Sequence, residues 1–288
     1  MIEMKKALST HLFVQEPLTT EVLESILAAG FEGTELFAVK PHFDYGNQRQ
    51  MNDLASWFSD HASFLQSIHT PFCVDYQAGA NREWLSIGDP ERVRRQIAID
   101  AIRWTLELAE RVPLPHAVVH MGTPDDRHTA KHLDAIYYSL ETLVPFAEAR
   151  GTRLLLENIP NGLSRIERMR RFLEDAHLER VGLCFDSGHA HLNASVEGEI
   201  RDGGPWIIAT HLHDNHGVRD EHLLPFEGSI DWLKVLQAFE ATSYQGSWTL
   251  EVKAGNRSSE GALKQAFHCF DRFQECQEEL LEMKMREE

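Results

Sequence analysis

Six short apolar segments of the chain each end on a side chain that can bind a divalent metal ion. The six terminal residues are His69, His120, Glu157, Asp186, His211 and Glu251. With 16 histidines and 45 acidic residues among 288, roughly one position in five would carry such a residue by chance. If the segments are strands of a parallel barrel, their carboxyl ends meet at one mouth, where barrel enzymes hold their catalytic groups. The pattern predicts a metalloenzyme.

The last four of these residues form a mixed set of carboxylates and one imidazole: Glu157, Asp186, His211 and Glu251. Any one of them alone is more simply explained as a surface acid or as a hydrogen-bonded core histidine. Together, hard oxygen ligands with one nitrogen suit manganese, magnesium, zinc or cobalt better than a softer metal. We therefore predict that these four side chains hold a divalent ion.

Further candidates lie close to these strand ends. In Asp186-Ser187-Gly188-His189, a tight turn can direct both the aspartate and the histidine into the mouth. His211 and His213 share one face of their strand because side chains alternate along it. We favour His211 as the metal ligand and His213 as a neighbouring residue or substrate contact. In the loop that follows, Asp220 and His222 can offer two ligands to a second metal.

Three more residues have weaker patterns. Lys253 follows Glu251 with strand periodicity and could contact an anionic group of a substrate. Glu35, read as the end of the second strand, either faces the mouth or is a solvated acid. His11 belongs to no motif, and we expect it to be a structural or surface residue.

Strand and helix patterns alternate along the chain. The first, second and seventh strands are predicted at Ala7–Phe13, Gly33–Phe37 and Ile207–His213, and the others end at the residues named above. Helices are predicted at Thr20–Ala29, Met51–Phe64, Glu91–Arg111, Thr129–Arg150, Arg165–Glu174, Ile230–Thr242 and Gly261–Met283, with no defined element between Asp186 and Pro205. Eight strand units of this kind favour a single (β/α)8 TIM barrel over residues 1–288. The main rival, an open doubly wound sheet, would usually carry a glycine-rich turn after its first strand, and none is present.

The composition of the chain indicates which classes of binding partner and which cellular location to expect. A net charge of −17 gives no general attraction to nucleic acid, so a small molecule is the expected partner. No segment approaches the roughly 18 apolar residues of a membrane span, and the first residues precede no apolar signal core. The four cysteines form no CxxC pair, which favours reduced thiols in a cytoplasmic protein. The sequence is compatible with a monomer or a homo-oligomer.

In their order along the chain, these motifs resemble those of the xylose isomerase-like TIM barrels. This superfamily comprises sugar-phosphate isomerases and epimerases together with apurinic-site nucleases of the endonuclease IV type (AP endonuclease family 2). The resemblance rests on Ile68-His69-Thr70-Pro71, Val119-His120-Met121-Gly122, Leu156-Glu157-Asn158, Phe185-Asp186-Ser187-Gly188-His189, His211-Leu212-His213-Asp214-Asn215, Asp220-Glu221-His222 and Leu250-Glu251-Val252. It covers nearly the whole chain.

The resemblance implies two alternative metal sites. In the isomerase and epimerase branch, one ion is held by the equivalents of Glu157, Asp186, His211 and Glu251. In the nuclease branch, a three-metal zinc cluster also uses the positions that match His69, His120, His189, Asp220 and His222. The chain has a suitable residue at each of these positions. Because of its acidic charge and the lack of basic loops for a bent duplex, we favour the small-molecule branch.

We accordingly predict a divalent-metal-dependent isomerase or epimerase that acts on a ketose-like sugar or sugar phosphate through an enediolate. Glu157 and Glu251 would move a proton on the two faces of the substrate, which His189, His213, Asn158 and Lys253 would contact. One ion is expected, and the residues have room for as many as three. The alternatives are an apurinic-site phosphodiesterase with a zinc cluster and a barrel that binds metal without catalysis.

Overall fold

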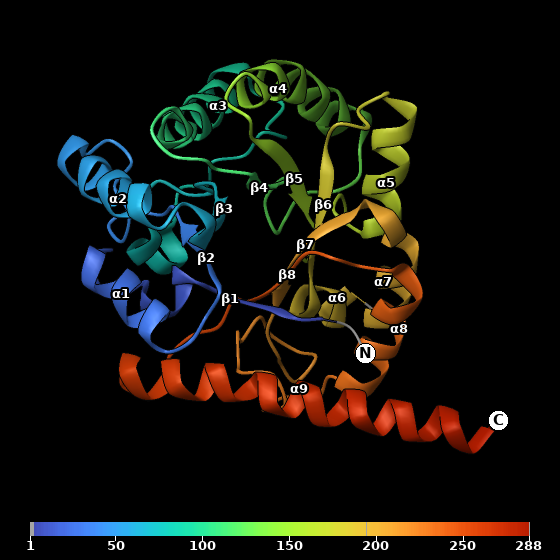
Figure 1. Ribbon diagram of the computed structural model, residues 1–288. Coiled ribbons are helices and arrows are strands. Elements are labelled where there is room, and N and C mark those ends of the chain that lie inside the picture. Colours follow the sequence, from blue (N-terminus) through green and yellow to red (C-terminus); the bar gives the residue numbers. More distant parts are fainter. Residues whose placement is uncertain (1–2, 194, 288) are drawn as a thin grey trace.

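The protein folds as a closed parallel barrel, which confirms the predicted fold class. The computed structural model describes residues 3–193 and 195–287. Within them, eight parallel strands pair in chain order, and β8 closes onto β1 (Figure 1). The strands are β1 Lys5–Ser9, β2 Gly33–Phe37, β3 Leu65–His69, β4 His116–His120, β5 Arg153–Glu157, β6 Gly182–Asp186, β7 Ile207–Leu212 and β8 Ser247–Leu250. An open doubly wound sheet is therefore excluded.

Helices surround the barrel on the outside (Figure 1). The α-helices are α1 Thr20–Ala28, α2 Gln48–Asp60, α3 Arg92–Leu106, α4 Ala130–Glu148, α5 Ile166–Asp175, α6 Ser187–Asn193, α7 Val196–Gly203, α8 Trp232–Thr242 and α9 Ser259–Glu287. Short 3-10 helices are η1 Thr10–Phe13, η2 Ala62–Phe64, η3 Tyr76–Asn81, η4 Glu107–Glu110 and η5 Gly204–Trp206. The long α9 packs against α8 and η1.

Local sequence explains where several helices begin and end. Asn47 caps α2 by accepting hydrogen bonds from the N–H groups of Arg49 and Gln50. Gly30 follows α1 with a φ of +98°, a conformation that glycine adopts at little cost. The apolar faces of the helices pack on the outer faces of the strands, where Leu36 and Trp248 are fully buried.

The inside of the barrel holds a small apolar cluster below the mouth. Val118, Leu155, Cys184 and Ala209 are buried together, one each from β4 to β7. Each lies two residues before the mouth residue of its strand, so side-chain alternation directs both residues inward. The cluster separates the carboxyl end of the barrel from its amino end.

Several predicted boundaries differ from those of the structure. The seventh and eighth strands each end one residue early, at Leu212 and Leu250. The first strand ends at Ser9 rather than Phe13, because the Ser9 hydroxyl accepts a hydrogen bond from the N–H of His11 and the chain turns into η1. The second helix begins at Gln48 and ends at Asp60, and Ala62–Phe64 forms η2 instead. The predicted helix Glu91–Arg111 is divided into α3 and η4. The segment after Asp186, predicted without structure, forms α6 and α7.

Two composition-based expectations can be compared with the structure. All four cysteines are unpaired thiols, with Cys73, Cys184 and Cys269 buried and Cys276 half-buried. Among the helices of residues 3–193 and 195–287, none combines the length and apolar character needed to cross a membrane.

Candidate metal centre

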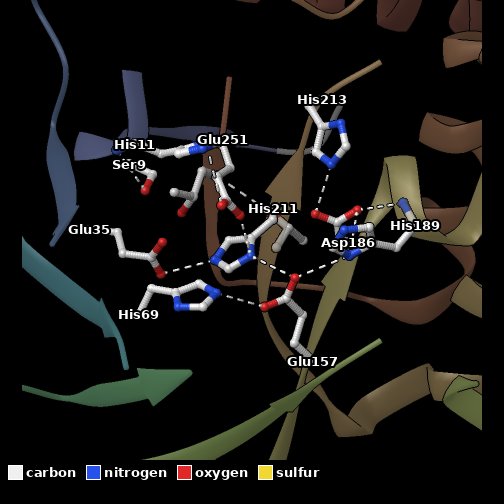
Figure 2. Close-up of polar contacts among 12 residues, drawn as sticks. Ser9, His11, Glu35, His69, Glu157, Asp186, His189, His211, His213 and Glu251 are labelled. Atoms are coloured by element: carbon white, nitrogen blue, oxygen red, sulfur yellow. Dashed lines mark hydrogen bonds and ion pairs between the residues drawn. The ribbon is translucent and has the colours of Figure 1, made fainter. Parts of the chain in front are cut away.

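The ends of β5 to β8 bring four side chains to one point in the mouth. Glu157, Asp186 and His211 are fully buried and Glu251 nearly so. Strand register sets them side by side, since Asp186 pairs with His211 across β6 and β7. One ligand atom from each of the four lies within 4.8 Å of the others. The four residues predicted as a metal set therefore form one cluster (Figure 2).

The ligand atoms of this cluster have lone pairs that suit a cation. Glu157 Oε1, His211 Nδ1 and Glu251 Oε2 are buried, and within the described chain they make ion-pair contacts but no hydrogen bond of good geometry. His211 Nδ1 lies 3.5 Å from Glu157 Oε1 and 2.8 Å from Glu251 Oε2. Buried polar atoms are rarely left unpaired, because losing water without a replacement partner is costly. Three such atoms facing one another form a donor set that suits a divalent ion.

A second group of ligand atoms shares Glu157. His69 Nε2, His120 Nε2 and Glu157 Oε2 lie within hydrogen-bonding distance of one another, at 3.1 Å between the two imidazoles and 3.1 and 3.2 Å from them to the carboxylate. Glu157 thus presents Oε1 to the first group and Oε2 to the second. A carboxylate in this position could bridge two ions.

A third group gathers around Asp220 in the loop between β7 and α8. Asp220 Oδ2 lies 3.0 Å from His222 Nε2 and 3.5 Å from His189 Nε2. His213 Nε2 lies 3.8 Å from Asp220 Oδ1 and 3.1 Å from Asp186 Oδ2, which connects this group to the first. The structure therefore joins the nine predicted ligand positions and His213 in one continuous cluster.

The buried carboxylate of Asp214 holds the loop that carries Asp220 and His222. It accepts hydrogen bonds from the backbone N–H groups of Asn215, Phe226 and Ile230 and from the indole N–H of Trp232. An antiparallel bridge between Asp214 and Leu223 adds two backbone hydrogen bonds. The loop is fixed by internal hydrogen bonds.

His211 and His213 occupy different groups. His211 lies between Glu157 and Glu251, whereas His213 contacts Asp186 and Asp220. Residue 188 must be glycine here, because a Cβ atom on Gly188 would lie 1.9 Å from the His213 ring. His211 therefore lies within the four-residue set, and His213 contacts two of the carboxylates.

The sequence left one residue of the site, Glu35, undecided and missed a second, His11. Glu35 lies in the middle of β2, buried, where its Oε2 accepts a hydrogen bond from Ser67 and lies 3.0 Å from His211 Nε2. His11 is buried on η1, with Nδ1 3.6 Å from Glu251 Oε1 and Nε2 3.1 Å from the Tyr76 hydroxyl. Glu35 is therefore neither a strand end nor a solvated acid. An acid inside a buried five-residue strand was the signal available for it.

Two predicted substrate contacts have other contacts in the structure. The Asn158 amide donates to the carbonyl of Asp186 and accepts from its N–H, at 2.9 and 2.7 Å, so it positions that ligand. Its backbone carbonyl also lies 2.9 Å from Nδ1 of His189, which orients that ring. Lys253 is half-buried beside the mouth and its backbone N–H donates to the carbonyl of His222.

Charge in the mouth is dominated by carboxylates held in the ionised form. Burial by itself would raise the pKa of Glu157, but the imidazoles of His120 and His211 lower it well below its usual range. The same opposition, with His211 as the main partner, lowers the pKa of Glu251. Burial would raise the pKa of Asp220, and His222 and His189 lower it. The mouth therefore concentrates buried negative charge that positive groups must balance.

The histidines divide into two kinds. Burial opposes protonation of every imidazole in the mouth. Neighbouring carboxylates nevertheless raise the pKa of four of them, His69, His189, His211 and His213. At His211, Cys184 also contributes. Burial lowers the pKa of the other three, His11, His120 and His222. At His11, the charge of His222 lowers the pKa further. Neutral imidazoles are ready metal ligands, and the protonated ones would have to release a proton first.

The chain belongs to the xylose isomerase-like TIM barrel family, whose sequence pattern it matches over residues 23–273. An uncharacterised protein of Methanocaldococcus jannaschii, MJ1311, is 29% identical over 264 residues, which cover 88% of this chain and 85% of that protein. The family resemblance noted from the motifs is thereby confirmed.

Solved structures share the same fold. A D-tagatose 3-epimerase-like protein superposes with a TM-score of 0.77 at 24% identity and covers 96% of this chain and 100% of its own. The D-psicose 3-epimerase of Clostridium cellulolyticum H10, solved with D-tagatose, gives a TM-score of 0.76 at 16% identity over 95% of this chain and 99% of its own.

Proposed function

We propose that the protein is a divalent-metal-dependent isomerase or epimerase of ketose-like sugars. The observation that carries this proposal is the convergence of three unsatisfied buried atoms, from Glu157, His211 and Glu251, on one point in the mouth. The fold shared with a D-tagatose 3-epimerase-like protein and a D-psicose 3-epimerase supports a sugar as the substrate class.

A bound divalent ion would polarise a substrate carbonyl and its neighbouring hydroxyl, and would stabilise the negative charge that develops when a carbon-bound proton leaves. Glu157, Asp186, His211 and Glu251 would hold it. Glu157 at the end of β5 and Glu251 just after β8 both face Nδ1 of His211, at 3.5 and 2.8 Å (Figure 2). Because these two strands lie apart around the closed barrel, the two carboxylates would approach a substrate from different faces. One carboxylate would take the proton from carbon, and the other would return one to the second face. His11, packed against Glu251, would orient that carboxylate.

Metal binding is tested by ligand substitutions. Glu251→Gln or Asp186→Asn should lower the metal content of the purified protein sharply, as measured by elemental analysis, because each removes an anionic ligand. The matched control is Glu167→Gln on the exposed face of α5, where the acid pairs with Arg171. If both mouth variants retain stoichiometric metal, the proposed ligand set is wrong.

Proton transfer is tested in deuterated water across a panel of ketoses and their phosphates. The wild type should incorporate deuterium at the carbon beside the carbonyl, as seen by proton NMR. A Glu157→Gln variant that still holds metal should lose about 10²–10⁴-fold in epimerisation, the usual contribution of a positioned acid or base. Turnover without exchange would indicate a hydride shift instead. If neither turnover nor exchange occurs, a barrel that binds metal without catalysis is the better reading.

The second and third ligand groups favour one alternative, an apurinic-site phosphodiesterase with a metal cluster. His69 and His120 beside Glu157, and His189 and His222 beside Asp220, are more donors than a single ion needs. Elemental analysis and anomalous scattering distinguish one ion from three. Efficient nicking of a duplex with an abasic site by the metal-loaded protein would replace the sugar epimerase proposal, whereas the charge of −17 leads us to expect none at physiological salt.

A further inference from the structure

Two cationic side chains beside the mouth have no carboxylate partner. Within the described residues, no ion pair of 4.0 Å or less involves Lys253 or Arg82, although the chain has 45 acidic residues against 28 basic ones. Arg82 Nε is buried without a hydrogen-bond partner, and its Nη2 donates only to the backbone carbonyl of Tyr76, at 3.2 Å. Unpaired cations next to a site rich in acids require an explanation.

Arg82 is held in place by a structured loop after β3. The loop folds back on itself through an antiparallel bridge between Cys73 and Trp84, with hydrogen bonds from Val74 N to Glu83 O and from Leu85 N to Phe72 O. The guanidinium lies over three aromatic rings, 4.6 Å from the centroid of Tyr76, 5.4 Å from Trp84 and 5.8 Å from Phe72. Stacking restrains the planar group and leaves N–H donors on its edge available.

A chain of contacts connects Arg82 to the metal centre. Arg82 stacks on Tyr76, the Tyr76 hydroxyl lies 3.1 Å from His11 Nε2, and His11 Nδ1 lies 3.6 Å from Glu251 Oε1. Lys253 follows Glu251 by two residues and is anchored through its backbone to His222. The contacts through Tyr76 and His11 thus place Arg82 on the side of the mouth that holds Glu251 and Lys253.

We propose that Lys253 and Arg82 form an anion subsite, which binds a phosphate or carboxylate group at the end of the substrate away from its carbonyl. The inference rests on the proposed function and restricts it to anionic ketoses. An anion would offset the repulsion between two neighbouring cations and accept hydrogen bonds from both. The guanidinium fork matches the geometry of phosphate and carboxylate oxygens, and the ammonium adds a point charge.

The test is calorimetric binding of unreactive polyols to the protein with its metal, in a buffer free of phosphate. The wild type should bind sorbitol 6-phosphate at least tenfold more tightly than sorbitol, and gluconate shows whether a carboxylate is accepted in place of phosphate. Lys253→Met and Arg82→Met should each reduce this preference by about 10–100-fold, the usual value of a hydrogen bond to a charged group. Lys253→Arg and Arg82→Lys should restore part of it. The control is Lys264→Met on α9, where the lysine pairs with Glu260.

Each outcome separates the subsite from the reaction. If sorbitol and its phosphate bind equally, the subsite does not exist. The same holds if both methionine variants keep the preference for the phosphate, because that preference then comes from the metal. Such a result leaves the epimerase proposal intact wherever free ketoses exchange deuterium. If the variants lose the preference while no ketose or ketose phosphate exchanges, the subsite is correct and the proposed reaction is wrong. Unchanged metal content and unfolding temperature in the variants exclude misfolding as the cause.

Discussion

The two ends of the barrel both contain polar side chains, but only one end satisfies them internally. At the amino end, Lys5 Nζ donates to Gln66 Oε1 at 2.8 Å, and the Ser247 hydroxyl donates to the same oxygen at 3.1 Å. His116 Nδ1 lies 3.3 Å from the carbonyl of Gln66. At the carboxyl end, by contrast, buried atoms of Glu157, His211 and Glu251 face one another at 2.8–3.5 Å as ion pairs, without hydrogen bonds of good geometry.

This difference indicates which polar groups maintain the fold and which are available to bind a ligand. Buried polar groups that serve stability find partners within the protein, because leaving them unpaired costs free energy. A group selected to hold a cation or a substrate keeps its lone pairs free instead. The apolar cluster of Val118, Leu155, Cys184 and Ala209 lies between the two ends and insulates one from the other. Changes at the amino end should therefore leave the metal centre unaffected.

Removal of the proposed metal is expected to lower the stability of the whole protein. A ligand present at 100 times its Kd stabilises the folded state by about 2.7 kcal/mol, and at roughly 2–4 °C per kcal/mol a chelator should lower the unfolding temperature by about 5–10 °C. The reason is that the crowded carboxylates of the mouth lose the cation that balances them. Differential scanning calorimetry before and after chelation provides the measurement.

The matched control for that experiment lies at the amino end. Gln66→Ala removes the acceptor shared by Lys5 and Ser247 and should cost about 1–2 kcal/mol, with the metal content and the shift on chelation both retained. The comparison of the two ends fails if chelation leaves the wild-type unfolding temperature unchanged, or if Gln66→Ala abolishes metal binding.

A second prediction contrasts the acids of the mouth with a buried acid outside it. Glu199 on α7 is 3% exposed, and burial raises its pKa from 4.5 to about 7, because Arg165, 3.6 Å away, compensates only in part. The folded state therefore favours the protonated acid. This contribution to stability is complete below pH 4.5 and is lost as the pH rises through about 7. At 1.36 kcal/mol per unit, the loss is about 3 kcal/mol.

Glu199→Gln should remove this dependence, since the amide does not ionise. The free energy of unfolding, measured with denaturant at pH 5 and pH 8.5, should fall by about 3 kcal/mol less in the variant than in the wild type between the two pH values. The exposed Glu167→Gln variant should follow the wild type at both. A difference between wild type and Glu199→Gln that is the same at pH 5 and pH 8.5 would contradict the raised pKa.

The smallest effect is expected from Glu35, which lies below the mouth. Glu35→Ala should weaken divalent metal binding by about 10–100-fold, the usual effect of losing a carboxylate that orients a ligating histidine. Its Oε2 lies 3.0 Å from His211 Nε2, so the ring would lose its orientation. Competition with a chelating dye measures the affinity. Ser67→Ala, which removes only the hydroxyl that donates to Glu35, should have a smaller effect. Equal affinities in Glu35→Ala and wild type would assign Glu35 to stability alone.

Much of the architecture could be predicted from patterns along the chain. The ends of β3, β4, β5 and β6 lie at His69, His120, Glu157 and Asp186 as expected, because a short apolar run followed by a polar residue and a turn is a local signal. Once the alternation of strands and helices indicates a parallel barrel, all strand ends must meet at one mouth. That rule places six of the nine ligand positions at the mouth, and the turn after Asp186, the loop after β7 and the family resemblance supply His189, Asp220 and His222.

Where the pattern depended on distant contacts, prediction failed. His11 was assigned to a strand continuation, but a serine cap turns the chain there and places the ring beside Glu251. Asn158 follows a ligand in sequence, yet its amide is used by the backbone of the next strand. The carboxylate beside His11 and the backbone bound by Asn158 both come from distant parts of the chain, although the cap that turns the chain at His11 is local.

Side-chain period and composition along the chain were thus enough to determine the barrel, its mouth and the donor types gathered there. Tertiary structure alone decided which donors face one another, which are already paired and which cations remain free. Glu35 and His211 are 176 residues apart and meet only because β2 and β7 face the same interior. The physical reason is that periodicity reports which face of a strand is buried, whereas the partner across a closed barrel is set by closure and register.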